Sequence, residues 1–520
     1  SSHRRQRQMC IRDRIIMKKI NFLLIMSAFI FVACSNEDNE VDAVVNIAPQ
    51  VVDLTAAITV ANNSSVDITL VGTDADGDDL TFSVVSQPSQ GSVDISGNKA
   101  TYTPSDNADG EDSFTYKAND GALDSNVATV TIDVTGNFVL NGEISSDRTL
   151  TADKIWTIKG RVFVGDGATL TIPAGTILKA EGGTGTNASF LAVARGGKLI
   201  ANGTADKPII MTSVSDDIKV GESVGSNLNV DNRGLWGGLL VLGKAPSSFK
   251  GDVSEYQIEG IPADDTRGLY GGSDASDNSG SMKYISIRHG GAEIGADNEI
   301  NGLTLGGVGS GTVIDNIEVV GNVDDGIEFF GGTVNASNLL VWGQGDDGLD
   351  IDQAYSGTVE NAMVIATAAS DHGMEIDGPE GSAKGKFTLK KITLVGSSSA
   401  ADGEYNDNRK GATGTIDGLV AFGFQAGKDF ELDADADSKT YTDGDLVFKN
   451  FQVDVPDGAS LTGGDIFDDK SSTPNANYED GKTIGGASFV TNVARASQTG
   501  GADVTVWAWS MAKARGADGL

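Results

Sequence analysis

A short phrase recurs five times in the second half of the sequence. Each copy begins with a polar residue or glycine, continues with mostly apolar residues and ends with glycine or alanine; the copies are 316–321, 338–343, 361–366, 391–396 and 418–423. Successive copies end 22, 23, 30 and 27 residues apart. A self-similar period of about 20 to 50 residues marks an architecture in which each unit stacks on the next. The spacing therefore predicts the coils of a solenoid, with loops where the spacing is longer.

A second phrase, with an acidic turn and a glycine, follows each of the first three copies. It reads Asp-Asp-Gly-Ile-Glu-Phe at 324–329, Asp-Asp-Gly-Leu-Asp-Ile at 346–351 and Asp-His-Gly-Met-Glu-Ile at 371–376, and 430–432 is a candidate later copy. Each coil thus contains at least two strands. Because side chains alternate between the two faces of a strand, Ile327 and Phe329 should point inward and Glu328 outward. The same alternation should place three further acids outward, namely Asp350, Glu375 and Glu431.

These outward acids should form a column along the solenoid, with the turn acids beside it (Asp324, Asp346 and Asp371). Successive coils lie about 4.8 Å apart. Two like charges at that distance repel by about 3.5 kcal/mol at an effective dielectric of about 20, and by less than about 1 kcal/mol in water. Three outcomes are open: the carboxylates splay into solvent, some keep a proton at a raised pKa, or a cation lies between them.

The fold class that these patterns predict is all-β. Leucine-rich horseshoes need a helix or their leucine signature, and propellers need longer periods. Segments 164–177, 197–213 and 236–239 resemble the opening coils of pectin-lyase-like surface proteins of marine bacteria. The resemblance implies a right-handed parallel β-helix, which we place at 137–500. Residues 501–520 are expected to form a C-terminal coil or cap, complete or truncated.

Residues 46–136 show a different pattern, with short runs of alternating apolar and polar residues that predict a β-sandwich. Three segments in this region resemble the bacterial cadherin-like repeat: 46–49, 72–80 and 112–121. In the second of them, Asp74, Asp76 and Asp78 alternate around a glycine turn and could converge on Ca²⁺, a cation that proteins hold with oxygen ligands. The alternative is a turn whose aspartates hydrogen-bond their own backbone.

The N-terminal residues indicate export. Residues 1–16 are basic and precede Met17, so we interpret them as an artefact or a miscalled start. Residues 17–33 read as a signal peptide, and the stretch before Cys34 resembles a lipobox. Cys34 is then the lipidated first residue of an acidic tether at 34–45, which resembles those that send lipoproteins of the Bacteroidetes group to the outer face of the outer membrane. The alternative is a secreted protein with a spare cysteine.

Charge narrows the choice of partners. The chain contains 38 Lys and Arg against 73 Asp and Glu, a formal net charge of −35. So acidic a protein repels nucleic acid and anionic membranes, and its natural small partners are cations. The alternative is that the scattered acids serve solubility.

Four motifs on successive predicted coils resemble, in the same order, those of polygalacturonase-type glycoside hydrolases. They are Asn-Val-Asp at 322–324, Gly-Asp-Asp at 345–347, Asp-His-Gly at 371–373 and Arg-Lys at 409–410. The resemblance implies that Asp346 or Asp347 is the general acid and Asp324 part of the base that activates water. It further implies that His372 orients these groups, while Arg409 and Lys410 clamp a substrate carboxylate. Acids on adjacent coils could reach the separation of an inverting hydrolase.

Other residues are candidates for ligand or metal binding. A lyase alternative would hold Ca²⁺ on Asp324, Asp346 and Asp350, with Arg288 or Arg409 as base, and Glu375 is a further candidate calcium ligand. Candidate substrate-binding residues are Arg288, His289, Trp342 and Tyr355. His289 could equally be a turn histidine bonded to backbone, and the two aromatic residues could equally be core or edge residues.

We therefore interpret the chain as a cell-surface lipoprotein that binds extracellular polysaccharide, or another surface, through acidic turns that Ca²⁺ tunes. One alternative is a glycoside hydrolase or lyase that acts on an acidic glycan. A second alternative is a structural stalk or coat protein. The fold does not choose among these, because one fold hosts many functions.

Overall fold

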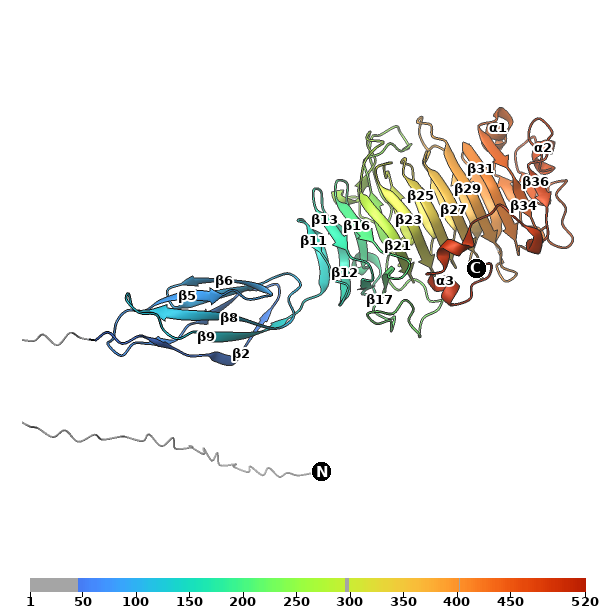
Figure 1. The fold of residues 1–520 in the computed structure, drawn as a ribbon. Coiled ribbons are helices and arrows are strands. Elements are labelled where there is room, and N and C mark those ends of the chain that lie inside the picture. Colours follow the sequence, from blue (N-terminus) through green and yellow to red (C-terminus); the bar gives the residue numbers. More distant parts are fainter. Residues whose placement is uncertain (1–44, 295–298, 402) are drawn as a thin grey trace, which may run out of the picture.

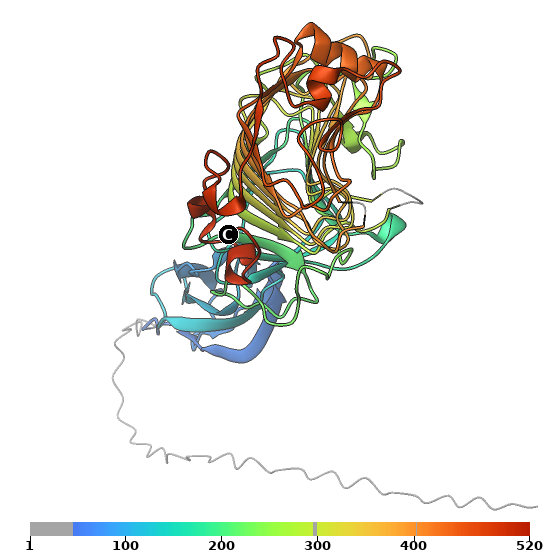
Figure 2. The same cartoon turned by 90° about the vertical axis from the view of Figure 1, so that its right-hand side faces the viewer.

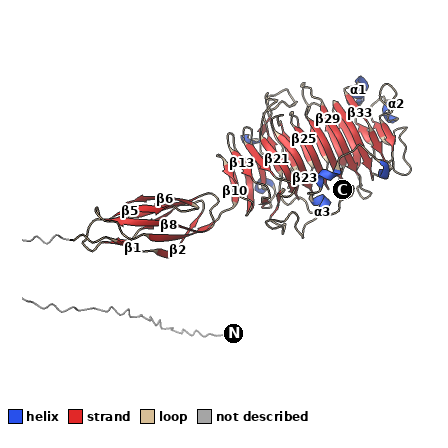
Figure 3. Ribbon diagram, viewed as in Figure 1, coloured by secondary structure: helices blue, strands red, loops and turns tan. Residues whose placement is uncertain are grey.

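The computed structural model describes residues 45–294, 299–401 and 403–520. The chain forms a small β-sandwich followed by a long right-handed parallel β-helix, as the sequence predicted (Figures 1 and 3). The sandwich lies beside the end of the helix that begins with β10 (Val139–Ile144). The predicted start artefact at 1–16, the signal peptide at 17–33 and Cys34 with nearly all of its tether lie outside the described residues. Within the described ranges, no helix is long and apolar enough to cross a membrane.

The sandwich consists of two sheets that pack on one core. One sheet has the order β2 (Leu54–Ala61), β9 (Ala128–Thr135), β8 (Gly110–Asn119), β5 (Thr81–Ser86), and the other β3 (Val66–Thr69), β7 (Lys99–Pro104), β6 (Gly91–Ser96). A short pair, β1 (Gln50–Val51) and β4 (Gly72–Thr73), adds to one end. Tyr102, Phe114 and Tyr116 are fully buried between the sheets. This core forms because apolar residues alternate with polar ones along each strand.

The β-helix is a parallel sheet of 25 strands that winds from β10 to β36 (Val490–Asn492). Its first coils contain β11 (Arg148–Thr149), β12 (Ile155–Val164), β13 (Thr169–Ile172), β14 (Ile177–Ala180), β15 (Phe190–Val193), β16 (Lys198–Asn202), β17 (Ile209–Ser213) and β18 (Leu239–Leu242). The long loop 243–279 follows and contains the antiparallel pair β19 (Tyr256–Gln257) and β20 (Leu269–Tyr270).

Two rows of strands run along the later coils. We call the first the long-strand row: β21 (Gly280–Arg288), β23 (Val313–Val320), β25 (Asn335–Trp342), β27 (Thr358–Ile365), β29 (Phe387–Val395) and β31 (Gly414–Phe422). The second is the short-strand row: β22 (Leu303–Gly306), β24 (Ile327–Phe330), β26 (Leu349–Asp352), β28 (His372–Asp377), β30 (Glu404–Arg409), β32 (Phe430–Leu432) and β35 (Phe467–Asp469). Each strand pairs in register with its counterpart one coil earlier.

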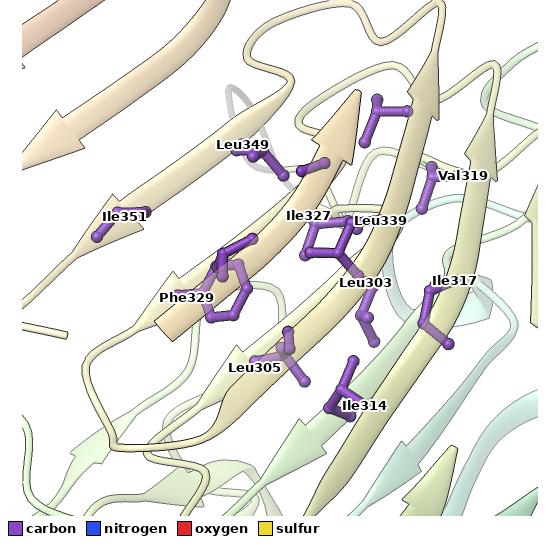
Figure 4. Packing of buried hydrophobic residues seen from close by; sticks show 14 of the residues in the cluster. Leu303, Leu305, Ile314, Ile317, Val319, Ile327, Phe329, Leu339, Leu349 and Ile351 are labelled. Carbon is purple, nitrogen blue, oxygen red and sulfur yellow. The ribbon is translucent and has the colours of Figure 1, made fainter. Parts of the chain in front are cut away.

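Apolar side chains from both rows meet inside the coils (Figure 4). Ile327 and Phe329 of β24 are fully buried and belong to one core cluster with Ile317 and Val319 of β23. Full burial of one such side chain contributes about 1.5–3 kcal/mol. Repetition over many coils explains how a chain whose only cysteines are Cys10 and Cys34 folds into one unit. In the last coils the core is aromatic, with Phe451, Phe467 and Phe489, and α2 (Ala476–Glu479) adds the fully buried Tyr478.

The first residue of each long-strand phrase bends the strand. Asn316, Asn338 and Asn361 adopt φ of 55°, 57° and 67°, Lys391 adopts 55° and Gly418 adopts 82°. Asparagine and glycine tolerate this left-handed conformation, whereas other residues pay roughly 1–2 kcal/mol. The recurring asparagine of the sequence phrase is therefore the corner of a coil.

Lys391 is the corner residue that fits this conformation least well, and we expect Lys391→Asn to stabilise the protein by about 0.5–1 kcal/mol. The ion pair that the change removes, Lys391 Nζ to Glu360 Oε1 at 3.0 Å, is about half exposed and contributes little. Thermal unfolding of the variant measures the gain. Lys390→Asn, one residue earlier outside the corner, is the matched control, and an equal shift in both variants would contradict the explanation.

The C-terminal residues return along the flank of the coils (Figure 2). Trp507 is fully buried, and its Nε1 donates to the carbonyl oxygen of Asn338 at 3.1 Å. At α3 (Met511–Ala514), the backbone N–H groups of Met511 and Ala512 donate to the carboxylate of Glu318. This segment covers apolar side chains that the long-strand row turns outward: Leu340, Met363, Ile365, Val395, Val420 and Phe422. Residues 501–520 thus seal a side of the helix. Another helix, α1 (Asp435–Asp443), follows β32.

Candidate functional site

Six carboxylates stand in register on consecutive coils of the short-strand row. Strand pairing aligns Glu328 with Asp350, Asp350 with Glu375, and onward through the next three coils to Asp407, Glu431 and Asp468. We call these six residues the acidic ladder. The predicted alternation is confirmed at its first members, because the flanking residues enter the core while the acids do not.

The first three members of the acidic ladder are nonetheless buried. Glu328, Asp350 and Glu375 are 5%, 9% and 8% exposed. Burial first, and neighbouring carboxylates second, raise the pKa of Glu328 and of Asp350 well above the ordinary range, and raise the pKa of Glu375 to about 8. The burial of these three acids rules out splaying into solvent. Protonation or a cation remains for Glu328 and Asp350, and Glu375 is bound by Arg409.

The long-strand row provides an internal comparison. Its outward positions align Lys283, Asp315, Ser337, Glu360, Lys390, Asp417 and Lys449 on consecutive coils. In this mixed ladder three basic and three acidic residues compensate each other. The acidic ladder contains no basic member over six coils, so the stacking of coils does not by itself impose its charge.

At the start of the acidic ladder, oxygens of Asp325, Glu328 and Asp350 lie within 4.8 Å of one another. Oδ1 of Asp350 is buried and has no hydrogen-bond partner. The amide of Asn301 holds Glu328 in place and also donates to Glu259 Oε1 of loop 243–279 at 3.3 Å. Burial and the charges of Asp350 and Asp347 raise the pKa of Asp325 as well. Three acids thus converge here around an oxygen that lacks a donor.

A second group links this cluster to the surface. Oxygens of Asp324, Asp325 and Asp346 lie within 4.8 Å of one another, and Asp346 is exposed. Burial and neighbouring acids raise the pKa of Asp324 to about 7 and that of Asp346 to about 6. Asp324 and Asp346, which the sequence proposed as catalytic residues, therefore do lie together.

The third group is built around His372. Its Nδ1 donates to Asp347 Oδ1 at 2.8 Å, and both lie within 4.8 Å of Glu375. Burial alone would lower the pKa of His372, but the hydrogen bond and the charge of Asp347 raise it to about 10. At neutral pH His372 is consequently a cation that is paired with Asp347 and held in one orientation.

Arg409 and Lys410 serve the site as internal counterions. The guanidinium of Arg409 binds Asp377 Oδ1 through Nε at 2.8 Å and Glu375 through a second nitrogen, and Lys410 Nζ also binds Asp377. The clamp that the resemblance implied needs cations that are available to a substrate carboxylate. The structure instead pairs both residues with acids of the protein.

Several site residues escaped the sequence reasoning. Asp407 lies between Glu375 and Glu431 in the ladder, although β30 has no Asp-x-Gly phrase. A fourth cluster joins Glu404, Asp429 and Glu431 within 4.8 Å. Counting from the coil corner does not find Asp407, because the corner precedes Glu328 and Asp350 by 12 residues but Asp407 by 16. The loop between β31 and β32 likewise hides the register of Asp429.

Four proposed substrate-binding residues lie elsewhere. Tyr355 is a core residue whose hydroxyl donates to the carbonyl oxygen of Val334 at 2.7 Å, so its predicted stacking role is wrong. Arg288 is 1% exposed, which excludes it as a substrate contact or as the base of a lyase. His289 is fully buried and donates from Nδ1 to the carbonyl oxygen of Asn232 at 2.7 Å, as the turn alternative held. Trp342 packs under the C-terminal segment.

The aspartate turn of the sandwich lies far along the chain from this site. Oδ1 of Asp74 accepts from the backbone N–H groups of Asp76, Gly77 and Asp78 at 2.8, 2.9 and 3.2 Å. These hydrogen bonds match the alternative prediction, a turn whose aspartates bond to their own backbone. Calcium at Asp74, Asp76 and Asp78 stays a prediction.

Comparison with known proteins supports the two-part architecture. Residues 142–511 match the family described as a pectate-lyase like beta helix domain, and residues 46–133 match the family described as a bacterial Ig domain. No curated protein matches the chain. Among solved structures, an endo-fucoidan hydrolase of glycoside hydrolase family 107 and a variant of it are each 24% identical over 18% of this chain, with TM-scores of 0.15 and 0.16. The aligned part spans 14% of those chains and carries no functional argument.

Proposed function

Because the chain belongs to the family of pectate-lyase-like β-helix domains, we propose that it is a surface protein that binds extracellular polysaccharide through divalent cations held on its acidic ladder. The family match supports the β-helix fold, and the acidic ladder supports the proposed binding of cations. Among the described residues, neither the sandwich nor the mixed ladder offers a comparable run of like charges.

The observation that carries the proposal is the burial of Asp325, Glu328 and Asp350 against one another with an unpartnered oxygen. A buried carboxylate is costly unless it is paired, protonated or bound to a metal. His372 is paired with Asp347, and Arg409 binds Glu375 and Asp377. Lys470 binds Glu431 and Asp468 at the far end of the ladder. Among the described residues, no such ion pair reaches Glu328 or Asp350. An incoming divalent ion would offset several like charges at once.

Calcium is the ion that fits this donor set best. The first two clusters offer carboxylate oxygens only, which hard cations prefer and soft metals do not. Ca²⁺ takes about six to eight oxygen ligands, more than three side chains provide. At the exposed Asp346 the remaining positions are open to hydroxyl or carboxylate oxygens of a sugar chain.

Gel retardation with soluble acidic and neutral polysaccharides tests the proposal. Retardation in the presence of Ca²⁺ should disappear in EDTA and in the Asp350→Asn variant, and Asp315→Asn on the mixed ladder is the matched control. Retardation that survives both EDTA and Asp350→Asn would refute the proposal. A stalk or coat protein would show no retardation under any condition.

A second candidate function, glycan hydrolysis, is favoured by one observation. Asp324 and Asp346 have pKa values of about 7 and 6, so part of the population carries a proton at neutral pH, as a general acid requires. Release of reducing ends or unsaturated uronides that Asp346→Asn abolishes would establish this activity. No product from any glycan that the protein retains would leave binding as the function.

Anchoring at the outer membrane, facing outward, completes the proposal. We expect the mature protein to carry acyl chains on Cys34 and to partition with membranes, since two chains suffice for stable anchoring. In Cys34→Ser the protein should lose incorporation of labelled fatty acid and appear in the medium. Cys10→Ser is the control and should change neither. Equal labelling of wild type and Cys34→Ser would refute the anchor.

A further inference from the structure

Hydrogen bonds and an ion pair hold the two domains together at their junction. Asn62 of the sandwich donates from Nδ2 to the carbonyl oxygen of Asp106 and accepts from the backbone N–H of Asn137, at 2.7 and 3.0 Å. Asp109 binds Lys154 of the β-helix at 2.7 Å. These bonds fix the linker against both domains.

A pocket of about 360 Å³ opens at this junction. Its lining is polar and comes from both domains: Asn63 and Asp106 from the sandwich, Asn137 from the linker, and Asn141, Asp147 and Arg148 from the first coil. Asp147 uses one oxygen to accept from the backbone N–H of Thr169 at 2.9 Å. The pocket therefore presents side-chain amides, carboxylates and one guanidinium to a common space.

Arg148 is the member of the lining that points most clearly to a ligand. Its guanidinium lies over Trp156, 5.1 Å from the ring centroid, and this contact orients it. Within the described ranges it has no hydrogen bond and no ion pair. Burial lowers its pKa, and Asp106 only partly offsets that effect. No nitrogen of this guanidinium is buried without a partner, so its donors face solvent and are available to a ligand.

We propose that this junction pocket binds a neutral sugar residue directly, without a metal ion. A sugar ring carries neighbouring hydroxyls that both donate and accept, and the lining offers acceptors in Asp106 and Asp147 and donors in Arg148 and the asparagine amides. Asp106, Asp147 and Glu143 disfavour an anionic group. Ligand sites often form between domains, and this one is separate from the acidic ladder.

A second pocket lies next to this one on the first coils. Glu143 lines both this pocket and a larger one of about 600 Å³, which Arg195, Lys244 and Arg267 also line. Glu143 lies 3.7 Å from Arg267, which Asp265 holds through two hydrogen bonds. Glu143 therefore stands between the two pockets.

Binding of neutral hexasaccharides (β-1,3-glucan, β-1,4-glucan and β-1,4-mannan) to the full chain in EDTA tests the proposal, because EDTA empties any cation site. Titration calorimetry should detect binding of at least one of them. Asn141→Ala and Arg148→Gln should each weaken it about tenfold or more, the loss of one or two good hydrogen bonds. Asn98→Ala, in an exposed sandwich hairpin, should leave it unchanged.

Asp350→Asn should also leave this binding unchanged, although it should abolish the calcium-dependent retardation. The two experiments therefore test the junction pocket and the calcium site independently of each other. Arg148→Gln also removes the contact with Trp156 and can therefore lower the melting temperature. If it does, the binding result for Asn141→Ala is the one that tests the proposal. Hexagalacturonate, titrated in the same way, is the anionic comparison. The proposal is overturned if none of the neutral hexasaccharides binds in EDTA, if only hexagalacturonate binds, or if Asn141→Ala binds as wild type does.

Discussion

The triple variant Glu328→Gln, Asp350→Asn and Glu375→Gln should be more stable than the wild type in EDTA. Each change keeps the shape of the side chain. Glu328→Gln and Asp350→Asn remove buried charges that no cation among the described residues pairs with, and Glu375→Gln removes a third charge beside them, which Arg409 binds. The gain should be roughly 3 kcal/mol or more, the size of one like-charge repulsion at this spacing. Thermal unfolding should show it as a rise of a few degrees.

In saturating calcium the wild type should be as stable as the triple variant, or more stable. The wild type alone keeps the ligands, and an ion present at 100 times its Kd stabilises by about 2.7 kcal/mol. Asp315→Asn, Glu360→Gln and Asp417→Asn on the mixed ladder form the matched control. There the acids face basic neighbours, so neutralisation should lower stability or leave it unchanged. A triple ladder variant that melts below wild type in EDTA would contradict the account.

Stability without divalent ions should fall as the pH rises from about 5 to 8. The pKa values of Asp352 and Asp407 are about 7 and that of Glu375 is about 8, against ordinary values of 3.8 and 4.5. These groups bind protons more tightly in the folded chain. Their contribution is therefore fully present below about pH 4 and is lost as the pH passes through 7 to 8.

The expected size of this loss is several kcal/mol. A shift of three pKa units corresponds to about 4 kcal/mol for one group acting alone, and coupling among neighbours makes the sum smaller than the parts. His372, with its pKa raised to about 10, extends the decline to alkaline pH. Asp112 and Asp265 act in the opposite sense, because their lowered pKa values remove stability only below about pH 4.

Melting temperatures from pH 4 to 9 in EDTA should thus peak near pH 4 to 5. In the presence of calcium the melting temperature should fall less between pH 5 and 8, since the ion neutralises the carboxylates after they lose their protons. A melting temperature in EDTA that rises steadily from pH 5 to 8 would show that the carboxylates are charged at no cost.

The fold was predictable because its signals are periodic and local. The phrase that begins at Asn316 repeats since each coil needs a left-handed corner, and the apolar residues after it alternate because strands do. The acidic column followed from the same alternation at Glu328, Asp350 and Glu375. At these positions the alternation in the sequence predicts the same alignment of acids that the strand pairing shows.

The rest depended on contacts that sequence spacing does not carry. The burial of Glu328 involves Asn301 and loop 243–279, which precede it by a coil or more. Arg409 became an internal counterion because Asp377 ends the preceding strand at the same level. Tyr355 looked like a sugar platform, but the turn after β26 directs it into the core. The roles of such residues depend on neighbours that are distant in the sequence, so they cannot be predicted from local patterns.

Calorimetric titration of Ca²⁺ into EDTA-treated, dialysed protein at pH 7 tests the cation site most directly. Because protonated carboxylates must lose protons to coordinate the ion, binding should be saturable and should release protons, so that its heat differs between buffers of different ionisation enthalpy. The Glu328, Asp350 and Glu375 triple variant should lose this signal. The absence of saturable heat in the wild type, or the same heat in the triple variant, would contradict a cation site on the ladder.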